Sequence, residues 1–279
     1  MIAGGQNGPP LVVLDGPIGT MLEQRGVPTP APLWSAAALR THPEEIARLH
    51  RAYADAGATV HTAATFRTSP YVAGDDAAAL TALAVQLARG SVPATHAVAG
   101  SLAPLEDCWR PERSPPDAGR WHRRTAALLA DAGVDLILVE TFANVDEAVA
   151  ATQAASETGL PVWTALTPGP EGRLLLPERV GASAARVREA GAEVVLLNCL
   201  PAARAERWAK PLAAHGGRWG VYANAGPRAD GMWHGDPGAA VRYAAFSEQW
   251  RTLGACVIGG CCFTGPDHIR AICQAVDPY

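Results

Sequence analysis

Three cysteines of this 279-residue chain have neighbours that suit metal chemistry. Cys261 and Cys262 follow two glycines at the end of a short apolar run, and Cys199 ends another such run that begins at Val194. If both runs are strands, their ends could bring three thiols to one metal ion. Three thiolates with one open position describe a catalytic zinc site. Such an ion would convert a bound substrate thiol into the nucleophilic thiolate.

Other interpretations of the thiols stay open at this point. A free cysteine at a strand end is commonly a small buried hydrophobe, and this is our interpretation of Cys108, Cys256 and Cys273. The vicinal pair differs, because two preceding glycines let the backbone turn sharply and approach a ligand closely. A strained vicinal disulfide is a further alternative, and zinc sites more often show Cys-x-x-Cys spacing.

Polar residues end several other apolar runs. Glu140 ends one of them, where a carboxylate is costly unless it caps a turn or holds a cationic ligand group. Asp15 precedes Gly16, so it is either an N-cap or a ligand contact. Asn198 and Asn224 suit hydrogen bonds that support a site. Together these groups suit a thiol-bearing amino acid, with a carboxylate for its ammonium group and a metal for its sulfur.

The elements that must position these residues follow a repeated order. Short apolar runs alternate with stretches rich in Ala, Leu, Glu and Arg at helical spacing, and Gly57, Gly133 and Gly191 stand where helices would end. Eight such units predict a single-domain α/β fold, the (β/α)8 TIM barrel, because a doubly wound sheet commonly has five or six strands. The runs are Leu11–Asp15, Thr59–Phe66, Thr95–Ser101, Asp135–Glu140, Val162–Thr167, Glu193–Asn198, Trp219–Asn224 and Ala255–Gly259.

Catalytic groups of such a barrel lie at the carboxyl ends of the strands, which is where the polar residues above stand. Two proline-rich stretches, Val27–Trp34 and Cys108–Arg120, predict long loops after the first and third strands. Long loops at that end of a barrel usually line the active site.

Composition limits the partners of the chain. The net charge of −4 gives no electrostatic footprint for nucleic acid or an anionic membrane, so we expect small-molecule substrates. Residues 1–10 are polar and rich in Gly and Pro, which predicts a flexible segment without a secretory signal before one domain at residues 11–279. We therefore expect a cytoplasmic protein with free or metal-bound thiols. Whether it forms a homo-oligomer stays open.

Taken in order, the run ends and loops resemble the homocysteine S-methyltransferase family, which includes S-methylmethionine-dependent and betaine-dependent enzymes and the homocysteine module of methionine synthases. The resemblance extends through nearly the whole chain, and its final Gly-Gly-Cys-Cys makes it specific. The matching motifs are Leu14-Asp15-Gly16 with Gly19-Thr20, Pro32 to Ala36, Ala56-Gly57-Ala58, Gly100-Ser101, Glu140-Thr141, Asn198-Cys199, Asn224-Ala225-Gly226 and Gly259 to Cys262 with Gly265-Pro266 and Ile269.

The resemblance implies a zinc-binding barrel that methylates L-homocysteine to give methionine. It implies Zn²⁺ as the cofactor, with Cys199, Cys261 and Cys262 as ligands. Glu140 would hold the homocysteine ammonium group and Asp15 with Gly16 would help to form the amino-acid pocket. Thr141 and Asn224, in the matching motifs, are also expected to contact the substrate.

The methyl donor is expected to be small and diffusible, because no folate or cobalamin module accompanies the barrel. The resemblance favours S-methylmethionine or S-adenosylmethionine as the donor. The indoles of Trp34 and Trp233 are the first candidates to contact its sulfonium cation, and Trp109 is a further one.

Two residues depart from the family pattern. Pro17 has no N–H to offer a carboxylate, and Phe66 stands where some members have a tyrosine that can bind the metal. A catalytically silent zinc-binding or regulatory member is therefore one alternative. Another is a barrel enzyme that binds a phosphorylated ligand at Gly259–Gly260 and merely buries its cysteines.

Overall fold

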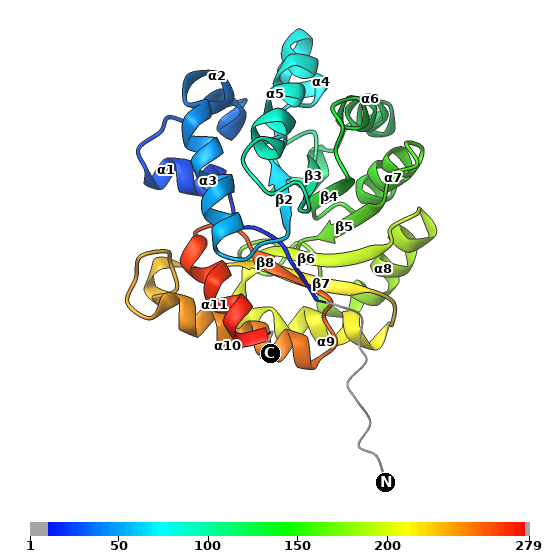
Figure 1. Ribbon diagram of the computed structural model, residues 1–279. Helices are drawn as coiled ribbons and strands as arrows, with labels where there is room; N and C mark the ends of the chain where they lie inside the picture. The colour runs from blue at the N-terminus through cyan, green and yellow to red at the C-terminus, as the bar shows by residue number, and fades with distance from the viewer. Residues whose placement is uncertain (1–10, 277–279) are drawn as a thin grey trace.

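A computed structural model describes residues 11–276, so the predicted flexible segment at residues 1–10 lies outside the described residues. Eight parallel strands form one sheet in the order β1-β8-β7-β6-β5-β4-β3-β2 (Figure 1). Hydrogen bonds from Thr59 N to Val13 O and from Asp15 N to Val60 O join β1 to β2, so the predicted (β/α)8 barrel is confirmed. The strands are β1 Val12–Val13, β2 Val60–Ala63, β3 Ala97–Leu102, β4 Leu136–Phe142, β5 Val162–Leu166, β6 Val194–Pro201, β7 Trp219–Asn224 and β8 Val257–Gly260.

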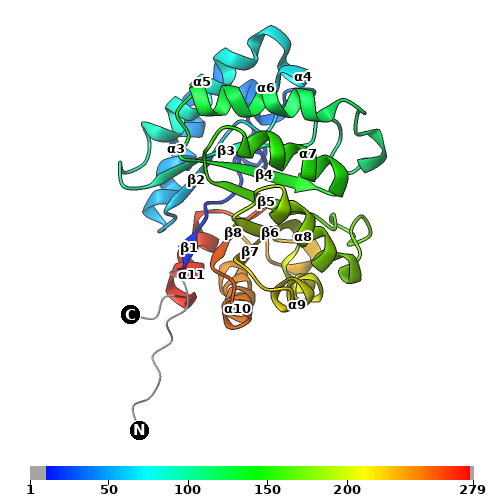
Figure 2. The ribbon, with the colours of Figure 1, turned by 90° about the vertical axis from the view of Figure 1, so that its right-hand side faces the viewer.

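Helices surround the strands, as the two perpendicular views show (Figures 1 and 2). None of the helices among the described residues is long and apolar enough to cross a membrane. The helices are α1 Gly19–Gln24, α2 Ala38–Thr41, α3 Pro43–Asp55, α4 Pro70–Ala73, α5 Ala77–Arg89, α6 Ala118–Asp131, α7 Val145–Ser156, α8 Val180–Glu189, α9 Glu206–Ala214, α10 Ala239–Thr252 and α11 Pro266–Val276.

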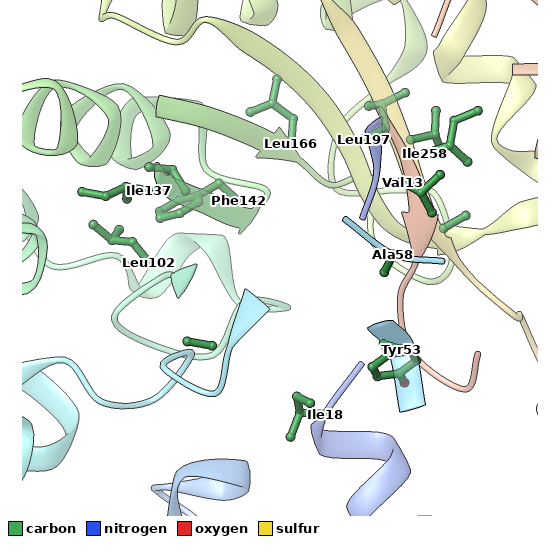
Figure 3. Close-up of a cluster of buried hydrophobic side chains, with 14 of the residues drawn as sticks. Val13, Ile18, Tyr53, Ala58, Leu102, Ile137, Phe142, Leu166, Leu197 and Ile258 are labelled. Atoms are coloured by element: carbon green, nitrogen blue, oxygen red, sulfur yellow. The ribbon is translucent and has the colours of Figure 1, made fainter. Parts of the chain in front are cut away.

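Alternation along the strands divides the core into two layers. On β4, Leu136 and Leu138 belong to the cluster that fills the barrel interior, whereas Ile137 and Val139 belong to the cluster between strands and helices. Figure 3 shows part of the outer cluster, in which Ile137 lies near Phe142 and Leu102. Glu140 therefore continues the interior face of β4.

Most predicted elements are present with small changes in their bounds. The three glycines expected at helix ends have left-handed φ values of 105° at Gly57, 82° at Gly133 and 113° at Gly191, which confirms their role. Strand β2 ends at Ala63 and does not reach Phe66, because the Thr65 hydroxyl turns to Ser101 O of β3. Helix α1, which follows soon after β1, was not among the predicted elements.

Candidate metal and substrate site

Two β-bulges shape the carboxyl end of the barrel. One extra residue lies between Val139 and Phe142 of β4, and another lies between Asn198 and Pro201 of β6. Each bulge holds a residue other than glycine in the left-handed region, Thr141 at φ 67° and Cys199 at φ 51°. Such a conformation costs about 1–3 kcal/mol and is concentrated at functional sites.

A direct contact connects the two bulges. Asn198 donates from Nδ2 to Thr141 Oγ1 over 2.8 Å, and Thr141 Oγ1 lies 4.0 Å from Cys199 Sγ. The bulge in β6 also determines where Cys199 points. Val194 and Leu196 point into the barrel, so simple alternation along the strand would place Cys199 on the outer face. Cys199 instead joins the interior cluster.

The structure brings the three predicted ligands together. The Sγ atoms of Cys199, Cys261 and Cys262 all lie within 4.8 Å of one another, and those of Cys199 and Cys261 are 2.9 Å apart. None of the three forms a disulfide. Hydrogen bonds from the two neighbouring thiols lower the pKa of Cys262, so the cluster favours a thiolate there. Three converging thiols, one on β6 and two directly after β8, are a donor set that suits zinc.

A tight turn after β8 carries two of these cysteines. A Cβ on Gly260 would lie 2.2 Å from Thr264 Oγ1, so any larger residue would displace the Thr264 side chain. The Thr264 hydroxyl donates to Cys261 O over 2.7 Å, and Cys261 N donates to Ala223 O over 2.7 Å. Phe263 follows at φ 67°. These contacts fix the direction of the vicinal thiols.

Glu140 is a buried carboxylate with two hydroxyl donors. Ser101 donates to Oε1 over 2.5 Å, and Tyr222 donates to Oε2 over 3.0 Å. Burial raises the pKa of Glu140 to about 7, although both hydrogen bonds act in the opposite direction, and the charge of Cys262 raises it further. Such a group can hold a cationic partner, which would itself favour the ionised form.

Asp15 is oriented by one residue of β2. Its carboxylate accepts hydrogen bonds from Thr62 N over 2.9 Å and from Thr62 Oγ1 over 3.0 Å. Burial raises the pKa of Asp15 well above its usual value, which the two bonds from Thr62 oppose. The neighbouring Gly16 lies against the ring of Tyr53, where a Cβ would come within 2.6 Å of the ring.

One cavity of about 760 Å³ connects these groups. Its floor is formed by Asp15, Glu140 and the three cysteines, and residues from both predicted long loops form its outer part. The outer lining includes aromatic and acidic side chains, namely Trp34, Phe66, Tyr71, Glu106, Asp107 and Trp109. The cavity therefore has a polar, sulfur-rich end and an aromatic end with carboxylates.

The predicted residues Gly16, Thr141 and Trp34 also line this cavity, but two others lie elsewhere. Asn224 is not among the lining residues, and its Oδ1 accepts from Gly226 N within the loop after β7. Trp233 is also absent from the lining, and it stacks on Phe263 with ring centroids 3.9 Å apart. Both side chains thus support the loops beside the cysteines.

Two lining residues, Ser101 and Tyr222, had no predicted role, and a third, Cys108, was predicted to have a different one. Ser101 and Tyr222 hold Glu140, and only their positions at strand ends could have indicated this. Cys108 was expected to be a buried packing residue, but it lines the cavity from the loop after β3. Burial raises the pKa of Cys108 to about 12, so it stays a neutral thiol.

Two backbone N–H groups at the end of β8 are already engaged and cannot donate to a phosphate. Gly260 N donates to Asp15 O and Cys261 N donates to Ala223 O. A phosphate-binding barrel with merely buried cysteines, the alternative interpretation, would therefore lack these two donors, and the thiols line a cavity.

Comparisons with known proteins agree with this geometry. A family model described as homocysteine S-methyltransferase matches residues 12–276. Betaine–homocysteine S-methyltransferase 1 of Mus musculus is 29% identical over 302 residues, which cover 96% of this chain and 72% of the relative. Homocysteine S-methyltransferase 3 of Zea mays is also 29% identical, with 94% and 88% covered. The metallated form of the homocysteine methyltransferase MmuM from Escherichia coli has a TM-score of 0.78 and 27% identity, with 94% of this chain and 95% of that chain covered.

Proposed function

Because the chain belongs to the homocysteine S-methyltransferase family, we propose that it moves a methyl group from S-methylmethionine or S-adenosylmethionine to the thiolate of L-homocysteine. The observation that carries this proposal is the convergence of three thiols and Glu140 at the floor of one cavity. The reaction would form a bond between the homocysteine sulfur and the methyl carbon while the carbon–sulfonium bond breaks. The products are methionine and a neutral thioether, and the thiol proton passes to solvent.

Zinc is the cofactor that the donor set favours. Cys199, Cys261 and Cys262 would hold it, since their sulfur atoms lie within 4.8 Å of one another at the cavity floor. A bound zinc ion lowers the pKa of a thiol that takes its remaining position. Asn198 and Thr141 keep Cys199 in its bulge, and the Thr264 hydroxyl keeps Cys261 in its turn.

The amino-acid part of homocysteine would lie between Glu140 and Asp15. Glu140 supplies a carboxylate for the ammonium group, and Ser101 and Tyr222 keep that carboxylate in one orientation. The substrate carboxylate would meet backbone N–H groups near the start of α1, from Gly16 or Ile18, because Pro17 has none. This arrangement would leave the substrate sulfur facing the three thiols.

The outer part of the cavity suits a donor with a net positive charge. Trp34 and Trp109 offer aromatic faces, whereas the Arg67 guanidinium already lies over Phe66, 5.2 Å from the ring centroid. Glu106 and Asp107 add two carboxylates against this one guanidinium, so the charge of these three side chains is net negative. S-methylmethionine and S-adenosylmethionine each carry one net positive charge at neutral pH, whereas betaine carries none. The charge of this lining therefore favours a sulfonium donor over betaine.

A methyl-transfer assay with labelled acceptor tests this proposal. The zinc-loaded chain is incubated with homocysteine labelled with ¹³C in its carbon backbone, together with S-methylmethionine, S-adenosylmethionine or betaine. Labelled methionine distinguishes the methylated acceptor from methionine left by the donor. We expect it with a sulfonium donor and much less with betaine. No labelled methionine with any donor, at full zinc content, would contradict the proposal and favour a catalytically silent member.

A further inference from the structure

A second group of metal-ligating side chains lies in the barrel wall, apart from the cysteines. Asp15 of the β1 end, His50 of α3 and His61 of β2 each offer one ligand atom, and these atoms lie within 4.8 Å of one another. All three side chains are buried, with exposed fractions of 2%, 0% and 0%. The group has one carboxylate and two imidazoles.

The two imidazoles have nitrogen atoms without well-aligned hydrogen bonds. Neither ring nitrogen of His50 has a hydrogen-bond partner among the described residues. Nδ1 of His61 forms no well-aligned hydrogen bond there, although the Ala58 backbone lies close enough to raise the pKa of the ring. The other nitrogen of His61 lies 3.0 Å from Nδ1 of His96. A buried polar atom without a partner costs about 1–3 kcal/mol, so a protein interior rarely contains two of them on one ring beside a carboxylate.

The protonation of the two imidazoles suits a cation. Burial lowers the pKa of His50 to about 3 and that of His61 to about 4, so both rings are neutral at pH 7. A neutral imidazole has a lone pair for a metal ion. The Asp15 carboxylate uses Thr62 as donor but keeps further lone pairs, because each of its oxygens accepts one hydrogen bond from Thr62.

A third cluster, formed by His234, Asp267 and His268, provides a contrast. There His268 has partners for both ring nitrogens, since Nε2 lies 2.6 Å from Met232 O and Gly265 N donates to Nδ1 over 3.2 Å. Its Nε2 must donate to the carbonyl oxygen, and the lone pair on its Nδ1 accepts from Gly265 N, so no lone pair is left for a metal. Of the three clusters within residues 11–276, the group around His50 is the one that combines convergence with two unpartnered nitrogen atoms on a single imidazole.

We propose that Asp15, His50 and His61 form a second site for a divalent transition-metal ion, such as Zn²⁺ or Co²⁺. Two nitrogen ligands and one carboxylate oxygen suit metal ions of this borderline class better than Mg²⁺ or Ca²⁺. Asp15 lines the large cavity, so an ion can enter from that side. In so far as the proposed function holds, an ion here would engage Asp15 and weaken homocysteine binding, so excess metal would inhibit.

A cobalt titration of the metal-depleted full chain tests the second site. We expect one equivalent of Co²⁺ to produce the intense near-ultraviolet absorption of thiolate-to-cobalt charge transfer. A second equivalent should then add only weak visible bands, because imidazole and carboxylate ligands lack that transition. His50→Leu should abolish the second equivalent and keep the first. The matched control His96→Gln, which alters a neighbour of His61 outside the group, should keep both.

The titration overturns the proposal if the wild-type chain takes one equivalent, or if His50→Leu leaves the second unchanged. His61→Leu is a further variant with the same expected loss, should His50→Leu fail to fold. Thermal unfolding gives an independent measurement, since the second equivalent should raise the midpoint of the wild-type chain and not that of either variant. These results do not depend on methionine formation, so the second site and the proposed function can fail separately.

Discussion

The phenol of Tyr222 on β7 donates to Oε2 of Glu140 on β4 over 3.0 Å, between strands that are not neighbours in the barrel. The contact lies inside the barrel, where both side chains are buried. Ser101 of β3 satisfies the other carboxylate oxygen. Because burial alone would keep Glu140 protonated, these two hydroxyls decide how much of the carboxylate is ionised near neutral pH.

Replacing Tyr222 by phenylalanine should raise the pKa of Glu140 above its present value of about 7. A hydrogen bond to a charged group contributes about 1.5–3 kcal/mol, so the pKa should rise by about one unit or more. Methionine binding can report this, because methionine has the ammonium group but no thiol to titrate. Its dissociation constant should increase on the acid side, with a midpoint at higher pH in Tyr222→Phe. Tyr243→Phe, which removes a hydroxyl that does not contact Glu140, should leave the midpoint in place.

The raised pKa of Glu140 should also appear in the pH dependence of stability. Burial raises the pKa of Glu140 in the folded chain to about 7, whereas the usual pKa of a glutamate side chain is 4.5, so ionisation costs stability as pH rises through that window. The difference corresponds to about 3 kcal/mol at high pH. Glu140→Gln has no such loss. The unfolding midpoint of this variant minus that of the wild type should therefore increase from pH 5 to pH 8. The exposed control Glu157→Gln should show no such growth, and equal behaviour of both variants would refute the assignment.

The barrel could be predicted because its signals are local. Each strand is a short apolar run, and each of Gly57, Gly133 and Gly191 marks the end of a helix with its positive φ. The convergence of the cysteines followed from the rule that strand ends meet at one end of a barrel. The predicted residue types at that end were therefore sufficient to indicate the site.

The details that sequence could not provide depend on long-range contacts. Cys199 points inward only because a bulge adds one residue to β6, and no glycine marks that bulge. Trp233 stacks on Phe263 because of the path of the loop after β7, which local propensity does not determine. The partners of Glu140 come from β3 and β7, far from it in the chain.

Loss of one predicted ligand should remove metal and activity together. Cys199→Ala and Cys261→Ala each leave two thiols of the cluster, so zinc content measured by atomic emission should fall with methyl transfer. Prolonged treatment of the wild type with a chelator should have the same effect, and added zinc should reverse it. Cys256→Ala is a matched control. Cys256 is also buried inside the barrel, but its Sγ lies 3.4 Å from Trp219 O and is not one of the three converging thiols. Full zinc and full turnover in Cys199→Ala would contradict the ligand assignment.

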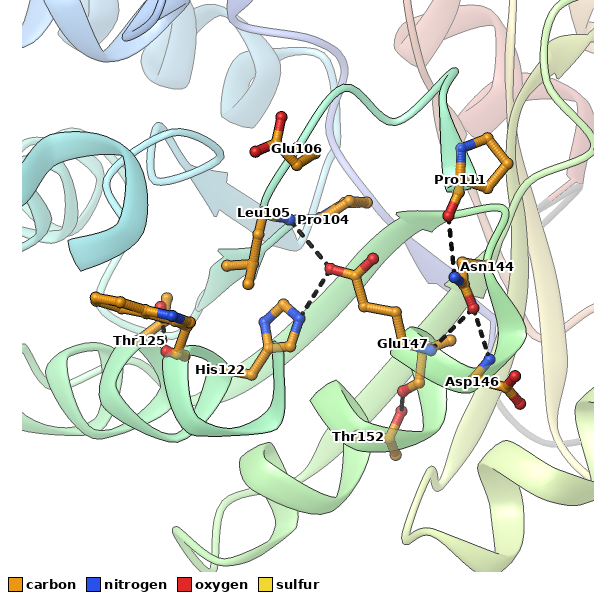
Figure 4. A network of polar contacts seen from close by, with 12 residues as sticks. Pro104, Leu105, Glu106, Pro111, His122, Thr125, Asn144, Asp146, Glu147 and Thr152 are labelled. Carbon is orange, nitrogen blue, oxygen red and sulfur yellow. Dashed lines mark hydrogen bonds and ion pairs between the residues drawn. The ribbon is translucent and has the colours of Figure 1, made fainter. Parts of the chain in front are cut away.

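Glu147 should control donor binding through the loop after β3 (Figure 4). Its carboxylate accepts from Leu105 N over 3.1 Å and lies 3.1 Å from Nε2 of His122, so it connects helix α7 to a loop that lines the cavity. Glu147→Gln weakens charge-assisted bonds to both partners, and the KM for the donor should rise more than the KM for homocysteine. Asp146→Asn, an exposed change on the same helix, should alter neither. An equal rise of both constants would instead indicate general loosening of the barrel.

Gly260→Ala should displace the turn that carries Cys261 and Cys262. The new Cβ would lie 2.2 Å from Thr264 Oγ1 and 3.0 Å from Thr264 Cβ, and the Thr264 hydroxyl is held by Cys261 O, so the neighbour has little freedom to move. We expect a lower zinc affinity and a lower unfolding midpoint. Adding Thr264→Ala makes room, so the double variant should recover part of the zinc affinity. Gly119→Ala on α6, where the Cβ would meet only Ala150 at 3.8 Å, should be neutral or slightly stabilising because alanine favours a helix. Zinc affinity in Gly260→Ala equal to that of Gly119→Ala would show that the turn tolerates the added methyl group and that its geometry does not hold the cysteines in place.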